Sequence, residues 1–278
     1  ISKSHATTII SFLTTTNILV LIATLGLRKK VVVSERNDPY RQKVKKVWSV
    51  LRRIFYPFAD SVVCNSQIAV KFFSKWKRIN NLLLIENSVR QLEVKEEVVF
   101  SKKFLLFVGR LHEQKRADLL IRAFSKANLN GYDLIILGDG PLKDELKSLT
   151  SDLNVDESVK FLGHLKDPYP YYRKAHAFVM CSDYEGSPNA LWEALSLGTP
   201  CIITDTVMEA VCHLTDNKNA LIVKSQDVRS LTRALIDISK NTVLRDRLKK
   251  NGPTVVKKFS HDNVNKKWDE LIFGNIAK

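Results

Sequence analysis

The sequence is poor in the residues that build metal centres and disulfide frameworks. Only four of its 278 residues are cysteine, and none of them forms a C-x-x-C pair. Three of the four lie in apolar, strand-like runs, which is typical of buried thiols in a reducing compartment. The six histidines show no H-E-x-x-H spacing, and no Asp-x-Asp element occurs. We therefore expect a cytoplasmic protein that uses no metal. The cysteines are Cys64, Cys181, Cys201 and Cys212.

An uninterrupted apolar run of membrane-spanning length is also missing. Residues 6–27 are only weakly polar and are followed by Arg28, Lys29 and Lys30, as a membrane helix would be. The polar break at 14–17 instead predicts a short strand followed by a helix with an N-cap. No secretory signal is convincing. Because the chain opens without Met, we interpret it as part of a longer protein.

Acidic residues are fewer than basic ones. The chain has 29 Asp and Glu and 44 Lys and Arg, which gives a formal charge of +15. This excess favours an anionic partner, which can be a nucleic acid, a phosphorylated metabolite or an acidic lipid. The chain contains no zinc knuckle, helix-turn-helix or RNP-like sequence. We therefore expect phosphates and lipid, and no nucleic acid.

Apolar runs of strand length alternate with segments of helical period along most of the chain, which predicts parallel sheets covered by helices. We divide the chain into a partial N-terminal domain (1–88), a linker (89–102), a C-terminal domain (103–258) and a C-terminal helix (259–278) that packs back on the first domain. The expected strands are 7–12, 31–34, 61–65, 82–86, 104–109, 133–138, 158–163, 176–182, 200–204 and 220–223. The expected helices are 16–27, 40–57, 66–76, 114–127, 141–153, 188–197, 227–240, 242–258 and 260–273.

Two glycine-containing turns follow predicted strands of the second domain. In FVGRLHEQK, Gly109 permits a tight exit from the strand, and Arg110 and Lys115 then flank the next helix. Ligands of α/β sheets bind at the carboxyl ends of strands, where these cations can contact phosphate oxygens. The alternative is a solvated Arg and Lys. The second turn, LGDGPL at 137–142, lacks the G-x-G-x-x-G and Walker spacings and indicates only a tight turn.

The segment EGSPNALWE, residues 185–193, brings two carboxylates to a predicted helix start. Ser187 can cap this helix and Pro188 fits its first position, so the free N–H groups there can bind phosphate. Glu185 and Glu193 cannot bind phosphate, but they can accept hydrogen bonds from sugar hydroxyls. Together these groups predict a nucleotide-sugar site. The alternative treats Glu193 as a favourable first-turn charge and Glu185 as a loop residue.

The ordered set of motifs resembles the family 4 retaining glycosyltransferases of the GT-B fold. The motifs that carry the resemblance are GRLxxxK (109–115), LGDGPL, FLG (161–163), the two glutamates of 185–193, and LGTPCIITD (197–205). ADSVVCNS (59–66) and IENSV (85–89) are similar to the end of that family's first domain, and SERNDP (34–39) is similar to a bacterial subset that builds capsule, O-antigen or other lipid-linked glycans. The resemblance implies two Rossmann-like, doubly wound parallel-sheet domains facing a cleft, the first of them incomplete.

The resemblance also implies roles for individual residues. Arg110 and Lys115 match the pair that holds the donor diphosphate, Glu193 the acid on the nucleotide ribose, and Glu185 the acid facing the transferred sugar. The turn near His164 matches the wall beside the base. The remaining matching donor-binding residues are Gly109, Gly186, Ser187, Pro188, Asn189 and Ala190.

Two departures from the family pattern stand out. Relatives usually carry a further N-terminal segment with a glycine-rich loop beside the donor phosphates. Many also have a histidine near the reacting sugar, where this chain has Glu35 and Arg36. Neither residue is assigned the role of that histidine.

Residues 41–58 form a predicted basic amphipathic helix. Its apolar residues share one helical face, and most of its Arg and Lys lie elsewhere, as in helices that bind anionic membrane surfaces. Packing on the chain's own sheet, with a solvated basic face, explains the same pattern and is compatible with membrane binding.

The expected activity is transfer of a sugar, with retention, from a nucleoside-diphosphate-sugar to a glycan or undecaprenyl-linked acceptor in bacterial surface polysaccharide biosynthesis. Glu185, Arg110 and Lys115 are the expected catalytic residues, and no cofactor is expected. The protein would be cytoplasmic, or peripheral on the inner face of the membrane. The alternatives are a non-catalytic nucleotide-sugar-binding fragment and a GT-B-fold sugar epimerase.

Overall fold

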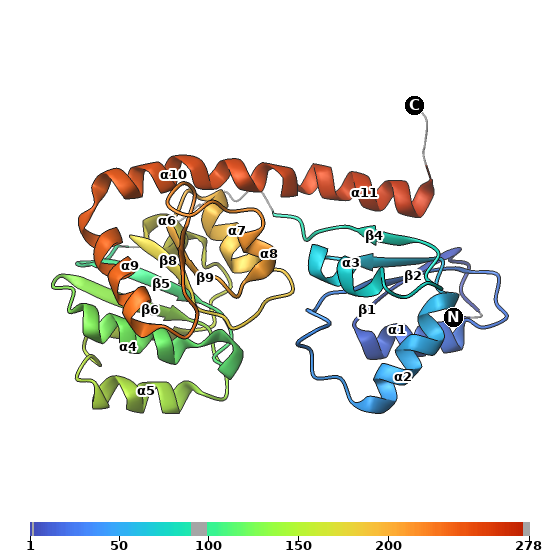
Figure 1. Cartoon of the computed structure of the whole chain (residues 1–278), viewed down its shortest axis with the longest axis horizontal. Coiled ribbons are helices and arrows are strands. Elements are labelled where there is room, and N and C mark those ends of the chain that lie inside the picture. Colours follow the sequence, from blue (N-terminus) through green and yellow to red (C-terminus); the bar gives the residue numbers. More distant parts are fainter. Residues whose placement is uncertain (2, 90–98, 275–278) are drawn as a thin grey trace. The chain divides into compact units, whose positions relative to one another are not determined.

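The computed structural model describes residue 1 and residues 3–89 and 99–274. Its contacts group the chain into two compact units. The first comprises Ile1–Ser88, Glu185–Ser187 and His261–Lys278, and the second comprises Val89–Tyr184 and Pro188–Ser260. Most of the predicted linker, residues 90–98, lies outside the described residues. Each unit is built on its own parallel sheet (Figure 1).

The first unit contains a four-stranded parallel sheet in the order β1-β2-β3-β4. Val31 and Val33 of β2 are buried on one face of this sheet, and Val32 is buried on the other. A strand buried on both faces needs no polar alternation, which explains the continuous VVV run. The strands are β1 Thr8–Phe12, β2 Lys30–Glu35, β3 Ser61–Cys64 and β4 Leu82–Leu84.

Helices cover both faces of the first sheet. One face packs against α1 (Thr14–Ala23), α2 (Lys46–Phe55) and α3 (Gln67–Phe73). The other face packs against Val264, Trp268 and Leu271 of α11 (His261–Phe273). The C-terminal helix therefore belongs to the core of the first unit, although it is far from that unit in sequence.

The start of α1 differs from the sequence-based expectation. The helix begins at Thr14, and its N-cap is Leu13, with φ 73° and no side-chain cap. Asn17 lies inside the helix, is fully buried, and donates to the backbone oxygen of Ser34 and to the hydroxyl of Tyr56. Thr14 and Asn17 thus make tertiary hydrogen bonds, and the predicted side-chain cap is wrong. Within the described part of the chain, no helix has the length and apolar character needed to cross a membrane.

The second unit contains a six-stranded parallel sheet in the order β10-β9-β8-β5-β6-β7. The chain first builds outward from β5 to β7 and then returns to the other side of β5 to build β8 to β10. The direction of winding therefore reverses between β5 and β8, where α/β sheets bind their ligands. The strands are β5 Lys103–Val108, β6 Tyr132–Leu137, β7 Val159–Gly163, β8 Ala177–Met180, β9 Cys201–Thr204 and β10 Leu221–Val223.

Helices also cover both faces of the second sheet. One core includes side chains of α4 and α9, and the other includes side chains of α6 and α7. Periodicity missed α6 and α8, which have six and four residues and are too short for a helical pattern to appear. The helices are α4 Ala117–Ala127, α5 Lys143–Asp152, α6 Tyr169–Lys174, α7 Asn189–Ser196, α8 Met208–Val211, α9 Val228–Lys240 and α10 Thr242–Val256.

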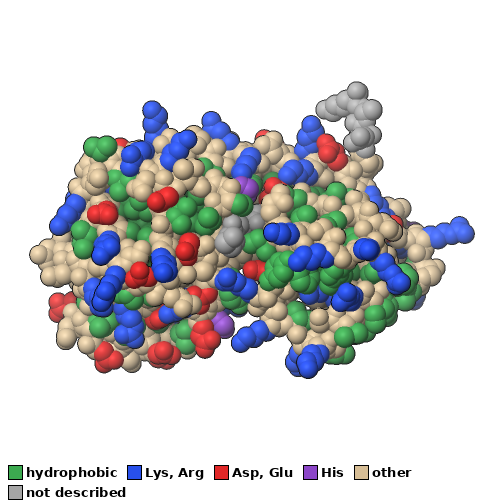
Figure 2. Space-filling view, in the orientation of Figure 1, with side chains coloured by type: hydrophobic (Ala, Val, Ile, Leu, Met, Phe, Trp, Pro, Cys, Tyr) green, Lys and Arg blue, Asp and Glu red, His purple; other side chains and the backbone are tan. Residues whose placement is uncertain are grey.

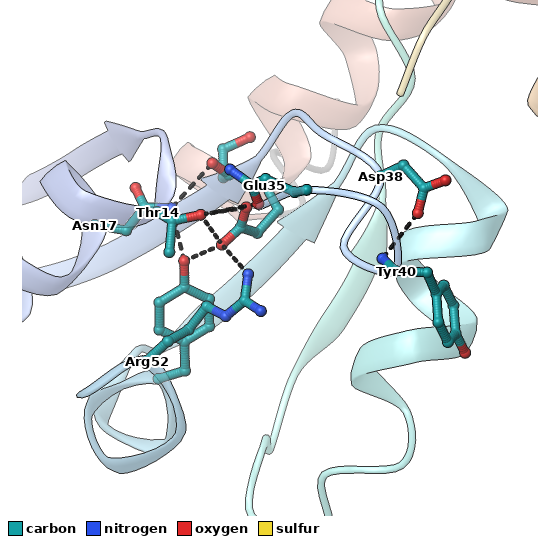
Figure 3. A network of polar contacts seen from close by, with 9 residues as sticks. Thr14, Asn17, Glu35, Asp38, Tyr40 and Arg52 are labelled. Atoms are coloured by element: carbon teal, nitrogen blue, oxygen red, sulfur yellow. Dashed lines mark hydrogen bonds and ion pairs between the residues drawn. The ribbon is translucent and has the colours of Figure 1, made fainter. Parts of the chain in front are cut away.

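A buried polar network joins β2 to α1 and α2 (Figure 3). Glu35, only 1% exposed, accepts hydrogen bonds from the Thr14 hydroxyl at 3.2 Å and from the Tyr56 hydroxyl. The Arg52 guanidinium lies 3.8 Å from the same carboxylate, and its side chain is 4% exposed. Burial raises the pKa of Glu35, while Tyr56 and Arg52 act in the opposite direction. Arg52 therefore belongs to the interior, whereas the pattern of residues 41–58 placed most of the Arg and Lys of this segment away from the packed face.

We expect Glu35→Ala to lower the free energy of unfolding by about 3 kcal/mol, because it leaves Arg52 as a buried charge without a carboxylate. Tyr56→Phe, which removes one hydroxyl and keeps the ion pair, should cost only about 1 kcal/mol. Urea denaturation followed by hydrogen exchange of the β2 amides measures both. Equal stability of Glu35→Ala and the unmodified chain would contradict the pairing.

Candidate active site

The turns that follow β5 and β6 are hydrogen-bonded to each other, and the second of them is also bonded to the last residue of β7. The N–H of Leu111 donates to the carbonyl of Asp139 at 2.9 Å, and the N–H of Gly138 donates to the carbonyl of Gly163 at 2.7 Å. Backbone hydrogen bonds between turns hold the residues that follow each strand in fixed positions. The carboxyl edge of this half of the sheet is therefore one connected structure.

Two glycines make this close approach of turns possible. At Gly138, φ is +132° and a Cβ would lie 1.9 Å from the carbonyl oxygen of Gly109. At Gly140, a Cβ would lie 2.3 Å from the carbonyl oxygen of Leu111. No side chain fits at either distance without a backbone shift. The sequence indicated only a tight turn here and did not reveal that the turn crosses the one after β5.

The two predicted cations lie on the turn that follows β5. Arg110 is exposed, and its side chain makes no ion pair with any described residue. Lys115 ends the short 3-10 helix Glu113–Lys115, and its aliphatic stem lies 3.7 Å from the position of a Cβ on Gly109. The next α-helix begins at Ala117. The cations therefore precede α4 on a separate turn, whereas a longer helix from 114 was predicted.

Gln114 fastens this turn to the loop after β8. Its Nε2 donates to the carbonyl of Tyr184 at 2.6 Å, and its own carbonyl accepts from the N–H of Asp183 at 2.8 Å. These bonds cross the point where the winding of the sheet reverses, and they fix the backbone beside Lys115. No pattern in the sequence identified Gln114, because its importance depends on a partner 70 residues away.

The same loop is also held by the last residue of β9 and by the turn after it. The hydroxyls of Thr204 and Thr206 both donate to the carbonyl of Ser182 at 2.9 Å. Further along, α7 begins at Asn189, and its N-cap is Pro188, which provides no side-chain cap. The predicted cap at Ser187 is therefore wrong, and Pro188 lies one position earlier than predicted. Because the N-cap residue makes no side-chain hydrogen bond to the helix, this N-terminus remains suited to an anion.

Glu193 lies one turn inside α7 and is half-buried. Burial raises the pKa of its carboxyl, and the neighbouring Tyr172 hydroxyl acts in the opposite direction. The first turn of α7 contains no acidic residue. The alternative interpretation, in which Glu193 is a favourable charge in the first turn of the helix, is therefore wrong. An interaction with the helix dipole does not explain why this carboxylate is half-buried.

The remaining predicted site residues fall in different parts of the structure. His164 is exposed directly after β7, and Asn189 and Ala190 open α7 in the second unit. Glu185–Ser187 belong to the first unit by their contacts. Glu185 is buried, and a Cβ on Gly186 would lie 2.7 Å from the carbonyl oxygen of Arg36. The roles of all these residues in binding stay predictions.

Residues 89–255 match the model of a protein family described as Glycosyl transferases group 1. The chain belongs to this family. The glycosyltransferase has the GT-B fold, as predicted. The residues that match the family model include the turns after β5 and β6 and the N-terminus of α7. Family 4 and retention of configuration stay predictions.

Two curated relatives of this glycosyltransferase come from Campylobacter jejuni. One is the GalNAc-alpha-(1->4)-GalNAc-alpha-(1->3)-diNAcBac-PP-undecaprenol alpha-1,4-N-acetyl-D-galactosaminyltransferase, 30% identical over 98% of this chain and 76% of its own length. The other is the N-acetylgalactosamine-N,N'-diacetylbacillosaminyl-diphospho-undecaprenol 4-alpha-N-acetylgalactosaminyltransferase, 31% identical over 89% of this chain and 71% of its own length. Among solved structures, Anabaena Alr3699/HepE in complex with UDP superposes with a TM-score of 0.83 at 16% identity, covering 95% of this chain and 78% of that one.

We expect Gly138→Ala to lower the free energy of unfolding of the second unit by at least about 2 kcal/mol, because the added methyl group meets a carbonyl oxygen of a crossing turn. Gly109→Ala is the matched control. Its Cβ would have no neighbour nearer than 3.7 Å, so we expect a small change. Urea denaturation of both variants measures the difference, and equal midpoints would contradict the crossing.

Proposed function

We propose that this glycosyltransferase moves a sugar from a nucleoside-diphosphate donor to a glycan or lipid-linked glycan acceptor in bacterial surface polysaccharide biosynthesis. The observation that carries the proposal is the arrangement at the point of reversal between β5 and β8, where two cations and an uncapped helix start follow neighbouring strands. The UDP bound by Anabaena HepE supports the donor class. The names of the Campylobacter relatives support an undecaprenyl diphosphate-linked acceptor.

In this proposal Arg110 and Lys115 bind the donor diphosphate. They stabilise the negative charge that develops on the leaving phosphate as the bond to the sugar breaks, which is usually the largest catalytic contribution in such transfers. Glu193 accepts hydrogen bonds from the nucleotide ribose, and Glu185 faces the transferred sugar. Two cations and the helix N-terminus supply the charge that a divalent metal would otherwise supply, so we propose that transfer needs no metal.

We further propose that transfer occurs on one face of the sugar with retention. The acceptor oxygen bonds to the anomeric carbon while the bond from that carbon to the leaving phosphate breaks, and the leaving phosphate takes the acceptor proton. A covalent intermediate would need a carboxylate nucleophile on the opposite face of the sugar. The motifs place no second carboxylate there.

Helix α2 supports the further proposal of an anionic membrane partner at the cytoplasmic face. Trp48, Leu51 and Phe55 pack on the core of the first unit, as a structural helix requires. A second set of apolar side chains of this segment remains at the surface, each more than half exposed: Val47, Val50, Ile54 and Phe58. Figure 2 shows green hydrophobic and blue basic side chains mixed over this part of the first unit. Such a surface suits anionic lipid headgroups.

A transfer assay tests the proposed function. The full chain is incubated with nucleoside-diphosphate-sugars and an undecaprenyl diphosphate-linked glycan, with and without EDTA, and the anomeric configuration of the product is read by NMR. We expect a retained configuration, activity that survives EDTA, and Lys115→Ala and Glu185→Ala variants with turnover reduced at least about 100-fold at unchanged thermal stability.

Three results would count against the proposal. Conversion of donor without acceptor would indicate an epimerase. Binding of nucleotide-sugar without transfer or hydrolysis would indicate a non-catalytic domain. Equal losses of turnover and stability in the two variants would overturn their catalytic roles.

The raised pKa of Glu193 predicts a pH dependence of donor binding. As pH falls through that pKa, the carboxyl gains a proton and becomes a poorer acceptor for ribose hydroxyls, so the donor KM should rise in the unmodified chain. Glu193→Gln should show a higher KM at neutral pH and no further rise on acidification. Steady-state kinetics between about pH 5 and pH 8 measure this. Parallel pH profiles in the two proteins would exclude Glu193 as the titrating group.

A further inference from the structure

Arg36 is held by three separate segments of the chain at the carboxyl edge of the first sheet. It directly follows β2, and its guanidinium carbon lies 5.1 Å from the ring centroid of Phe12, the last residue of β1. The same carbon lies 5.7 Å from the ring of Trp268 in α11. Its Nη1 donates to the Oδ1 of Asn87 at 2.6 Å. Two aromatic rings and an amide therefore fix the direction of this guanidinium.

The charge of Arg36 has no anionic partner among the described residues. Its neighbour Glu35 points to the opposite face of the sheet, as successive residues of a strand do, and is engaged with Tyr56 and Arg52. Arg36 is half-buried, and burial lowers the pKa of its guanidinium. Burying a cation that has no carboxylate partner lowers the stability of the folded protein. Such a group is typical of a site whose anion is a ligand.

The surroundings of Arg36 are polar. Asn65, which follows β3 and is 2% exposed, donates through Nδ2 to the carbonyl of Arg36 at 3.3 Å. The Oδ1 of Asn65 is buried and has no hydrogen-bond donor among the described residues. Buried amide oxygens nearly always have a donor, so this one indicates a place for a ligand hydroxyl or water. Polar side chains thus follow β2, β3 and β4 at the edge where parallel sheets bind ligands.

The loop that carries Glu185 belongs to the same unit and approaches Arg36 closely. A Cβ on Gly186 would lie 2.7 Å from the carbonyl oxygen of Arg36 and 3.0 Å from the Cα of Asn37. Only a glycine allows the two backbones to come so near. Arg36 is therefore a neighbour of the residue that the proposed function assigns to the transferred sugar.

We propose that Arg36 binds a phosphate group of a substrate at the carboxyl edge of the first sheet. A guanidinium that two rings and an amide hold in place has further N–H groups, and the planar fork of arginine matches two phosphate oxygens. The inference rests on the proposed function, in which two substrates carry a phosphate group that Arg36 can bind. One is the diphosphate of a lipid-linked acceptor, and the other is the diphosphate of the donor. Arg36 is then a substrate-binding residue separate from Arg110 and Lys115.

The direct test observes the Arg36 side chain itself. In the full chain labelled with nitrogen-15, the arginine Nε–H signal that disappears in Arg36→Lys is assigned to Arg36. We expect this signal to shift when inorganic pyrophosphate is added, and to shift equally in Lys115→Ala, where the other phosphate site is weakened. A signal that does not move at saturating pyrophosphate would overturn the proposal.

Kinetic variants then distinguish the two sources. Arg36→Gln should raise a KM at least about tenfold, the loss expected for a charge-assisted hydrogen bond. A rise confined to the undecaprenyl diphosphate-linked acceptor identifies the acceptor as the source, and a rise confined to the donor, with weaker binding of UDP, identifies the donor. Arg36→Lys, which keeps the charge, should recover part of the loss and controls for misfolding.

Arg28→Gln is the matched control, because Arg28 is exposed and lies just before β2, at the opposite end of the strand from Arg36. It changes the net charge by the same amount and should leave every KM unchanged. If both substitutions raised KM equally, the effect would come from the net charge of the protein and not from a specific contact of Arg36, which would overturn the proposal. If the unmodified chain transfers sugar and Arg36→Gln has the same kinetics, the role of Arg36 is refuted and the proposed function stands. If no protein in the series transfers sugar, the proposed function is refuted.

Discussion

The close crossing of the turns after β5 and β6 is the constraint on which the second unit's site depends. Gly138 and Gly140 have no Cβ, and this lets the two backbones meet at hydrogen-bonding distance. Because the turns are joined, the residues that follow β5 cannot move independently of the sheet. Gln114 extends the same rigidity to the loop after β8. A site held in this way can orient cations before any ligand arrives, which reduces the cost of ordering them on binding.

The positive charge at the carboxyl edge of the second sheet explains why this edge suits a diphosphate. Arg110 makes no ion pair with a described residue, and the N-terminus of α7 has no side-chain cap. Both features place positive charge at the carboxyl edge of the sheet, which favours the binding of an anion. In the first unit, adjacent residues illustrate the contrast. The charge of Glu35 is satisfied internally by Tyr56 and Arg52, whereas that of Arg36 is not.

Much of the fold could be predicted from the sequence, because buried parallel strands are continuous apolar runs and their ends are set by polar residues and glycine. β2, β5 and β9 begin or end within one or two residues of the expected positions. The motifs around Arg110, Lys115 and Glu193 also identified the family. The start of α1 was missed because Asn17 bonds to distant partners, and a sequence window contains no distant partners. The same limit concealed the burial of Arg52, the tie made by Gln114 and the crossing at Gly138.

We propose above all that the turn carrying Arg110 and Lys115 and the N-terminus of α7 bind one diphosphate together. Hydrogen–deuterium exchange of the full chain, with and without saturating UDP, tests it most directly. We expect slower exchange in two separate segments, 109–115 and 189–193, and a weaker effect in both when Lys115 is replaced by Ala. Protection of only one of these segments, or of neither while UDP is bound, would contradict it.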